Sequence, residues 1–252
     1  MKTLGFILIG LFLAVNGLEA QDTLYVYKGG VVIFEQVVTG VVIQPSCIYR
    51  DNVGNIFQTV TIGTQTWMAE NLRTTKYRNG DPIPNVTNNA SWSLLTTGAF
   101  CDYNTNAFNG TKFGNLYNWY AVNDPRNIAP IGWHIATDAE WTTLTTYVST
   151  HFGTSLNTAK ALAATTNWTT YATVGTVGNN PTINNYTGFS ALPYGYHDGT
   201  FHIAGTNTNW WTVNASDANN AWSRRINNSS NTVIRAGILK SYGYSVRCVR
   251  DY

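Results

Sequence analysis

The 252-residue chain is long enough to bury a sizeable core, and 44% of its residues are hydrophobic, which excludes a disordered composition. Charged residues make up only 11%, and 15 basic against 13 acidic side chains leave a formal net charge of +2, which offers no electrostatic footprint for nucleic acid. In place of charges the chain carries 35 Thr and 29 Asn, a polar surface typical of secreted and cell-surface proteins.

The first 20 residues have the pattern of a secretory signal peptide. Lys2 precedes an apolar run over 4–15, and Leu18-Glu19-Ala20 ends in a small residue suited to cleavage. The apolar run is shorter than the ~20 residues that a membrane-spanning helix needs. No Cys that could carry a lipid follows it. We therefore expect a secreted or cell-surface protein that is cleaved before Gln21 and has no membrane span.

Residues 21–50 are expected to form an N-terminal segment built on a β-hairpin. Two β-prone runs, 24–27 and 31–38, flank a Lys-Gly-Gly sequence, and Gly-Gly between such runs indicates a hairpin. The segment is almost free of charge, so an unpaired edge would readily accept another strand. It is expected either to pack on the main domain or to add a strand to a partner, which includes self-association of the chain.

The strongest helix pattern lies at 138–149. Thr137 and Glu140 form a capping box, and Trp141 and Leu144 follow at helical spacing. Beyond it, β-prone runs alternate with Gly, Asn and Ser turns, so we expect a second helix at 157–164 and strands at 201–203, 210–213, 221–226, 233–239 and 244–249.

Six stretches, in this order, resemble a known family: TVTIGTQTWMAENL (59–72), GNLYNWYAV (114–122), GWHIATDAEW (132–141), GFSALP (188–193), WW (210–211) and SVRCVRD (245–251). Together they resemble the Fibrobacter succinogenes major paralogous domain, a family of exported bacterial proteins, over about residues 51–252. The resemblance implies an α+β, C-type-lectin-like fold related to that of formylglycine-generating enzymes. It implies small twisted antiparallel sheets, two helices and long loops, preceded here by the N-terminal β-hairpin. It does not imply a specific function.

The three cysteines, Cys47, Cys101 and Cys248, show no spacing typical of a zinc site. In C-type-lectin-like folds the first and last strands usually lie side by side. The resemblance therefore implies a disulfide between Cys47 and Cys248, with Cys101 free and buried. Because no second Cys lies near Cys248 in the sequence, a structural half-cystine is favoured there over the cysteine chemistry of formylglycine-generating enzymes.

Other chemical groups have structural interpretations that we prefer. Glu70 and Glu140 could be a carboxylate pair for glycoside hydrolysis, but Glu140 belongs to the capping box and Glu70 to a stretch expected to be structural. His197, Asp198 and His202 could hold a metal, yet they fit a turn and a strand equally well. The tripeptides that bind calcium in C-type lectins are missing from the sequence. We expect no catalytic residue, no metal site and no cofactor, and leave a structural calcium elsewhere open.

The candidate ligand-binding residues lie late in the chain: Trp210, Trp211, Asn214, Arg224, Arg225, Asn227, Asn228 and Arg235. Successive residues of a strand face opposite sides, so one Trp could enter the core while the other meets a ligand, or loops could bury both. The leading hypothesis is a non-enzymatic binding or adhesion module for an unknown glycan or protein. The alternatives are a surface or filament subunit pairing through the 22–48 strands and, third, an enzyme of the formylglycine-generating type.

Overall fold

The computed structural model of the chain describes residues 22–28, 31–38, 49–51, 53–151, 157–202 and 204–251. The chain divides into two compact units, Met1–Cys47 and Ile48–Tyr252. The expected signal peptide lies outside the described residues, so its cleavage stays a prediction. Within the described ranges, no helix has the length and apolar character needed to cross a membrane.

The first unit contains the hairpin expected from the sequence. Strands β1 (Asp22–Lys28) and β2 (Val31–Val38) pair antiparallel, with a shift of register between Val26 and Tyr27. The hairpin is therefore confirmed as a local structure. Its packing on the main domain or on a partner stays a prediction.

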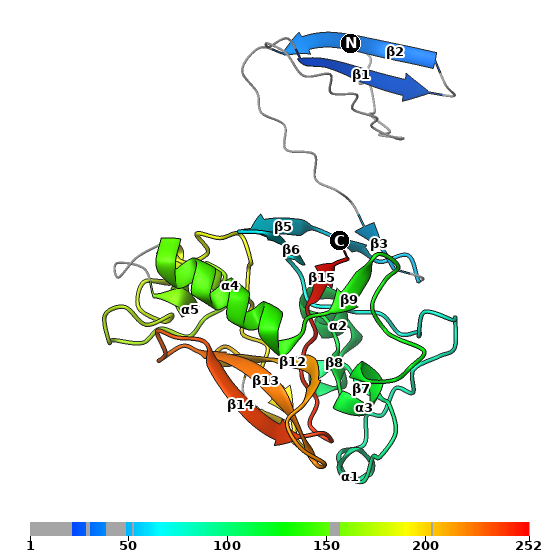
Figure 1. The fold of residues 1–252 in the computed structure, drawn as a ribbon, viewed down its shortest axis with the longest axis vertical. Coiled ribbons are helices and arrows are strands. Elements are labelled where there is room, and N and C mark those ends of the chain that lie inside the picture. Colours follow the sequence, from blue (N-terminus) through cyan, green and yellow to red (C-terminus); the bar gives the residue numbers. More distant parts are fainter. Residues whose placement is uncertain are drawn as a thin grey trace. The chain divides into compact units, whose positions relative to one another are not determined.

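The second unit is organised around two antiparallel sheets (Figure 1). The first has the order β5 (Thr59–Ile62), β6 (Gln65–Met68), β15 (Cys248–Arg250) and β9 (Trp133–Ile135). The last strand of the chain thus lies between two earlier strands, with Val249 opposite Trp67 on one side and His134 on the other. Gly63 makes the turn between β5 and β6 with φ +63°, a conformation that favours glycine.

The second sheet is a meander of β12 (Asn207–Ala215), β13 (Asn220–Asn227) and β14 (Ile234–Leu239), drawn in orange in Figure 1. Its register places Trp210 opposite Arg224, and Arg224 opposite Arg235. Directly opposed residues share one face of a sheet, so these three side chains lie on the same face.

Helix α4 (Asp138–His151) contacts β5 of the first sheet and both β12 and β13 of the second. Its start confirms the capping box. Thr137 Oγ1 accepts the Glu140 amide at 3.1 Å, and Glu140 Oε2 accepts the Thr137 amide at 2.8 Å. Trp141 lies between the sheets, and its ring centroid is 5.0 Å from that of Trp67 and 5.2 Å from that of Trp210. These rings are fully buried and form the centre of the core.

The remaining elements are short. They are the strand pairs β3 (Tyr49–Arg50) with β4 (Ile56–Phe57), β7 (Phe100–Cys101) with β8 (Leu116–Tyr117) and β10 (Tyr196–His197) with β11 (Phe201–His202), the helices α1 (Asn89–Ser93), α2 (Ala107–Phe113), α3 (Trp119–Val122) and α5 (Thr158–Leu162), and the 3-10 helices η1 (Tyr103–Thr105) and η2 (Pro181–Ile183).

The α+β class is confirmed, but the expectation of two helices is wrong. The described residues contain five α-helices, because α1, α2 and α3 add to the two helices expected from the sequence. Each of the three begins at an asparagine, Asn88, Asn106 or Asn118, whose side chain accepts a backbone N–H of the first turn. This capping stabilises helices of a single turn or two in a segment without clear helical periodicity.

Candidate ligand-binding site

Trp210 and Trp211, the two tryptophans among the candidate ligand contacts, are both fully buried, which is the second of the two arrangements considered for them. Trp210 packs between Trp141 and Phe189, whose ring centroids lie 5.2 and 6.0 Å away. Trp211 points to the other face of β12, where its Nε1 donates to the Tyr117 carbonyl at 2.9 Å. Strand β12 is therefore covered on both faces, and neither ring is available to a ligand.

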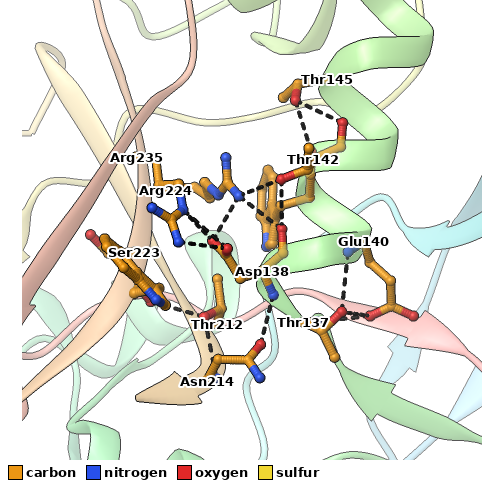
Figure 2. Close-up of polar contacts among 12 residues, drawn as sticks. Thr137, Asp138, Glu140, Thr142, Thr145, Thr212, Asn214, Ser223, Arg224 and Arg235 are labelled. Carbon is orange, nitrogen blue, oxygen red and sulfur yellow. Dashed lines mark hydrogen bonds and ion pairs between the residues drawn. The ribbon is translucent and has the colours of Figure 1, made fainter. Parts of the chain in front are cut away.

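Three of the polar residues predicted to contact a ligand instead bind Asp138 and so connect helix α4 to the second sheet (Figure 2). Arg224 Nη2 donates to Asp138 Oδ1 at 2.7 Å, and Arg235 forms an ion pair with Asp138 Oδ2 at 2.9 Å. Asn214 Oδ1 accepts the backbone N–H of Asp138 at 2.8 Å. Although burial opposes ionisation, hydrogen bonds and charge from Arg235 and Arg224 lower the pKa of Asp138. These interactions assign a structural role to the three side chains.

The other predicted contacts lie apart from this group. Arg225 is exposed and points to the opposite face of β13, because neighbouring residues of a strand alternate. Asn227 ends β13, and Asn228 Nδ2 donates to the Thr169 carbonyl at 3.3 Å. The fold does not bring the predicted residues together into one surface, and ligand contacts by Arg225, Asn227 and Asn228 stay predictions.

The groups weighed for catalysis or metal binding have local partners. Glu140 caps α4 and also contacts His134 Nε2 at 2.7 Å, while Glu70 forms an ion pair with Arg73 at 2.6 Å. His202 pairs with Asp198 at 2.8 Å. Among the residues with described positions, no group of three or more His, Cys, Asp or Glu side chains could hold a metal ion.

Cys101 and Cys248 are buried, and neither forms a disulfide within the described residues. Burial raises the pKa of both thiols well above the ordinary value, which disfavours the reactive thiolates. Cys47 lies outside the described residues, so the disulfide between Cys47 and Cys248 stays a prediction.

A cavity of about 450 Å³ lies elsewhere in the second unit. Its lining residues lie within five segments, 58–60, 69–73, 112–114, 164–166 and 185–192. Arg247, which directly precedes strand β15, completes the lining. Threonine, serine and amide side chains supply much of the wall, and Phe113 and Leu192 add apolar surface. Sequence reasoning missed this site, because its residues are far apart along the chain. One feature of the sequence does point to this site: Asn71 and Arg247 both lie within stretches that carry the family resemblance.

Arg247 lines the cavity although its side chain is only 1% exposed. Its Nε donates to Asn71 Oδ1 at 2.7 Å, and Nη1 donates to the carbonyls of Met68 and Phe189, each at 2.8 Å. Nη2 donates to the Ser190 carbonyl at 3.2 Å. All four acceptors are neutral, so the guanidinium is held in place without a carboxylate bonded to it.

Positively charged side chains outnumber negatively charged ones among the described residues that line the cavity. Burial lowers the pKa of Arg247 to about 9, with the Glu70 charge acting in the opposite direction, so Arg247 remains a cation at neutral pH. Glu70 is already bonded to Arg73. Lys112 is exposed, and its ammonium lies 4.8 Å from the centroid of the Phe113 ring. As far as the described residues go, the lining therefore contains three cations and one carboxylate.

Comparison with known proteins identifies the family. Residues 60–250 match the model of the Fibrobacter succinogenes major domain. No curated protein and no solved structure matches the chain. The matched region spans most of the chain and contains nearly all of the six stretches quoted above. The chain therefore belongs to the Fibrobacter succinogenes major domain family.

Proposed function

We propose that the chain is a non-enzymatic binding module of an exported protein and that its ligand binds in the cavity at Arg247. The observation that carries this proposal is that the residues lining the cavity come from the stretches that the family shares. Residues of four of the six family stretches, 59–72, 114–122, 188–193 and 245–251, meet at this cavity. Its volume of about 450 Å³ falls within the range of small-molecule sites.

The chemistry of the lining supports binding over catalysis. Among the described residues, the lining has no His and no Cys, and its single carboxylate, Glu70, is held by Arg73. Polar groups such as Thr59, Thr165 and Asn185 can orient a ligand through hydrogen bonds, but none of them is paired with a general base among the lining residues. Formylglycine-type chemistry would need a reactive thiol, and burial raises the pKa of Cys101 and Cys248, which disfavours their thiolates.

The proposal includes the C-type-lectin-like fold and a secreted or cell-surface location. The last strand β15 pairs with the early strand β6, although β6 is not the first strand of the unit, and this neighbourhood of early and last strands supports the fold. The composition, rich in Thr and Asn, and the signal-peptide pattern support the location.

A binding screen with matched variants tests the proposal. The chain is applied to glycan and protein arrays as wild type, as Thr165→Trp, which places a bulky ring at an exposed lining position of the cavity, and as Thr87→Trp, at an exposed site away from the cavity. We expect a ligand that binds wild type and Thr87→Trp equally and binds Thr165→Trp at least tenfold more weakly. Equal binding by all three proteins would place the ligand elsewhere, and the lack of any ligand would contradict a binding role.

A structural subunit is the second candidate, and the hairpin is the observation that favours it. β1 and β2 form a sheet of two strands within the described residues, and such a sheet is marginally stable alone. A strand from another copy would complete it. Size-exclusion chromatography and electron microscopy of the mature chain, with and without residues 22–38, test this candidate. Assemblies that persist without the hairpin would contradict it.

A further inference from the structure

We propose that the cavity binds a small hydroxylated ligand through an acidic group, a carboxylate or a phosphate, held between Arg247 and Lys112. The inference rests on the proposed function for its site and adds the class of ligand. Three features of the cavity carry it: a buried cation bonded only to neutral groups, a second cation in the lining, and polar walls.

The first feature is the buried guanidinium of Arg247. A buried charge is costly unless an opposite charge or several hydrogen bonds compensate it. Here carbonyl and amide oxygens supply hydrogen bonds, and no carboxylate of the described residues forms an ion pair with Arg247. Nη2 donates one hydrogen bond, to the Ser190 carbonyl, so it has a second N–H to offer. An anion in the cavity would accept that N–H and compensate the charge.

The second feature is the excess of positive over negative side chains among the residues that line the cavity. Glu70 forms its ion pair with Arg73 at 2.6 Å and its charge also acts on Arg247, while neither Arg247 nor Lys112 forms an ion pair of its own among the described residues. Lys112 is exposed and can move its ammonium toward a ligand, whereas Arg247 is fixed. A fixed guanidinium and a mobile ammonium together suit the oxygens of a carboxylate or a phosphate.

The third feature is the polarity of the walls. Thr59, Thr165, Thr166, Gln58 and Asn185 are among the lining residues, alongside apolar residues such as Val60, Phe113 and Leu192. The hydroxyl and amide groups among them both donate and accept hydrogen bonds, so they favour a ligand body with hydroxyl groups over an apolar one. The combination of one acidic group with a hydroxylated body describes a sugar acid or a sugar phosphate.

Three probes separate these chemistries: glucuronate carries a carboxylate, glucose 6-phosphate carries a phosphate, and glucose carries neither. Each is titrated into the full chain at low salt and followed by ligand-observed NMR. We expect at least one of the two acids to bind at least tenfold more tightly than glucose, and its affinity to fall as salt is added. Whichever acid binds more tightly identifies the group that the cavity prefers.

Matched variants locate the binding. Lys112→Gln removes the mobile cation, and Lys76→Gln removes an exposed lysine that does not line the cavity. We expect Lys112→Gln to weaken binding of the acid at least fivefold, Lys76→Gln to leave it unchanged, and Thr165→Trp to abolish it. All three changes leave the core intact, and circular dichroism checks that each variant is folded.

The outcomes distinguish this inference from the proposed function. If glucose binds as tightly as both acids, the acidic class is wrong while ligand binding in the cavity stands. If an acid binds equally to wild type and Lys112→Gln, the assigned role of Lys112 is wrong. If no probe binds, the sugar-acid inference is overturned, whereas the array screen with Thr165→Trp still decides the proposed function.

Discussion

Arg247 donates its Nε–H to Oδ1 of Asn71 at 2.7 Å, although 176 positions separate the two residues in the sequence. The same oxygen accepts the indole N–H of Trp210 at 2.9 Å, and Asn71 Nδ2 donates to the Phe113 carbonyl at 2.8 Å. One buried amide therefore connects the wall of the cavity to strand β12 and to the end of helix α2. The cavity and the core share this residue.

Replacing Asn71 by leucine tests the importance of this amide. Asn71→Leu leaves the donors of Arg247 and Trp210 buried without their acceptor, and each such loss costs about 1–3 kcal/mol. We expect the free energy of unfolding in urea to fall by about 3 kcal/mol or more. Asn123→Leu, at an exposed position, is the control and should change it by less than about 0.5 kcal/mol. Equal effects of the two variants would contradict the role of Asn71.

The ion pairs of Asp138 should differ greatly in their contribution to stability. The Arg224 side chain is only 5% exposed, so Asp138→Asn leaves a buried cation without its counter-ion. We expect a loss of roughly 2 to 4 kcal/mol, because Asp138 itself retains some contact with solvent. Arg235 is 41% exposed, and Arg235→Ala should cost less than about 1 kcal/mol. Urea denaturation of both variants decides the matter, and equal losses would show that Arg224 does not depend on Asp138.

The helix between the two sheets provides a graded test of the core. Trp141 is fully buried among other aromatic rings, so Trp141→Ala should lower the free energy of unfolding by about 3–5 kcal/mol. Thr137→Ala removes one capping hydrogen bond and should cost about 1 kcal/mol. Chemical denaturation measures both. A loss below about 1 kcal/mol for Trp141→Ala would mean that this face of α4 is not the core face.

His134 should make stability depend on pH. Its Nε2 lies 2.7 Å from Glu140 Oε1, and its Nδ1 lies 2.7 Å from Asp251 Oδ1. The hydrogen bond with Glu140 is the largest cause that raises the pKa of His134, to about 9, against the effect of burial. Because the folded pKa exceeds the ordinary value of 6.5, protonated His134 stabilises the folded chain fully below about pH 6.5, and this contribution is lost as the pH rises through about 9.

The measurement compares melting temperatures of wild type and His134→Gln between about pH 5 and pH 10. The advantage of wild type should be constant up to about pH 6.5 and should shrink as the pH rises through about 9, since other titrating groups are common to both proteins. A difference that does not change with pH over this interval would show that His134 is not held as a cation by its two carboxylates.

Local features of the fold were predictable because they depend on residues that are close in the sequence. The capping box of Thr137 and Glu140 requires only a four-residue pattern, and the hairpin of β1 and β2 requires two β-prone runs around a turn. The family stretches likewise identified the α+β class. The same reasoning missed α1, α2 and α3, since asparagine caps and tertiary contacts, rather than hydrophobic periodicity, stabilise such short helices.

The candidate site was decided by the tertiary structure alone. The alternation of Trp210 and Trp211 across β12 followed from strand geometry, but α4 on one face and the aromatic residues on the other determined that both rings are buried. The cavity depends on segments around residues 70, 112, 165, 190 and 247, which no sequence spacing connects. A periodic pattern reports which face of an element is apolar, whereas the path of the chain between distant elements determines which polar side chains meet. Arg247 and Asn71 meet only because β15 inserts between β6 and β9.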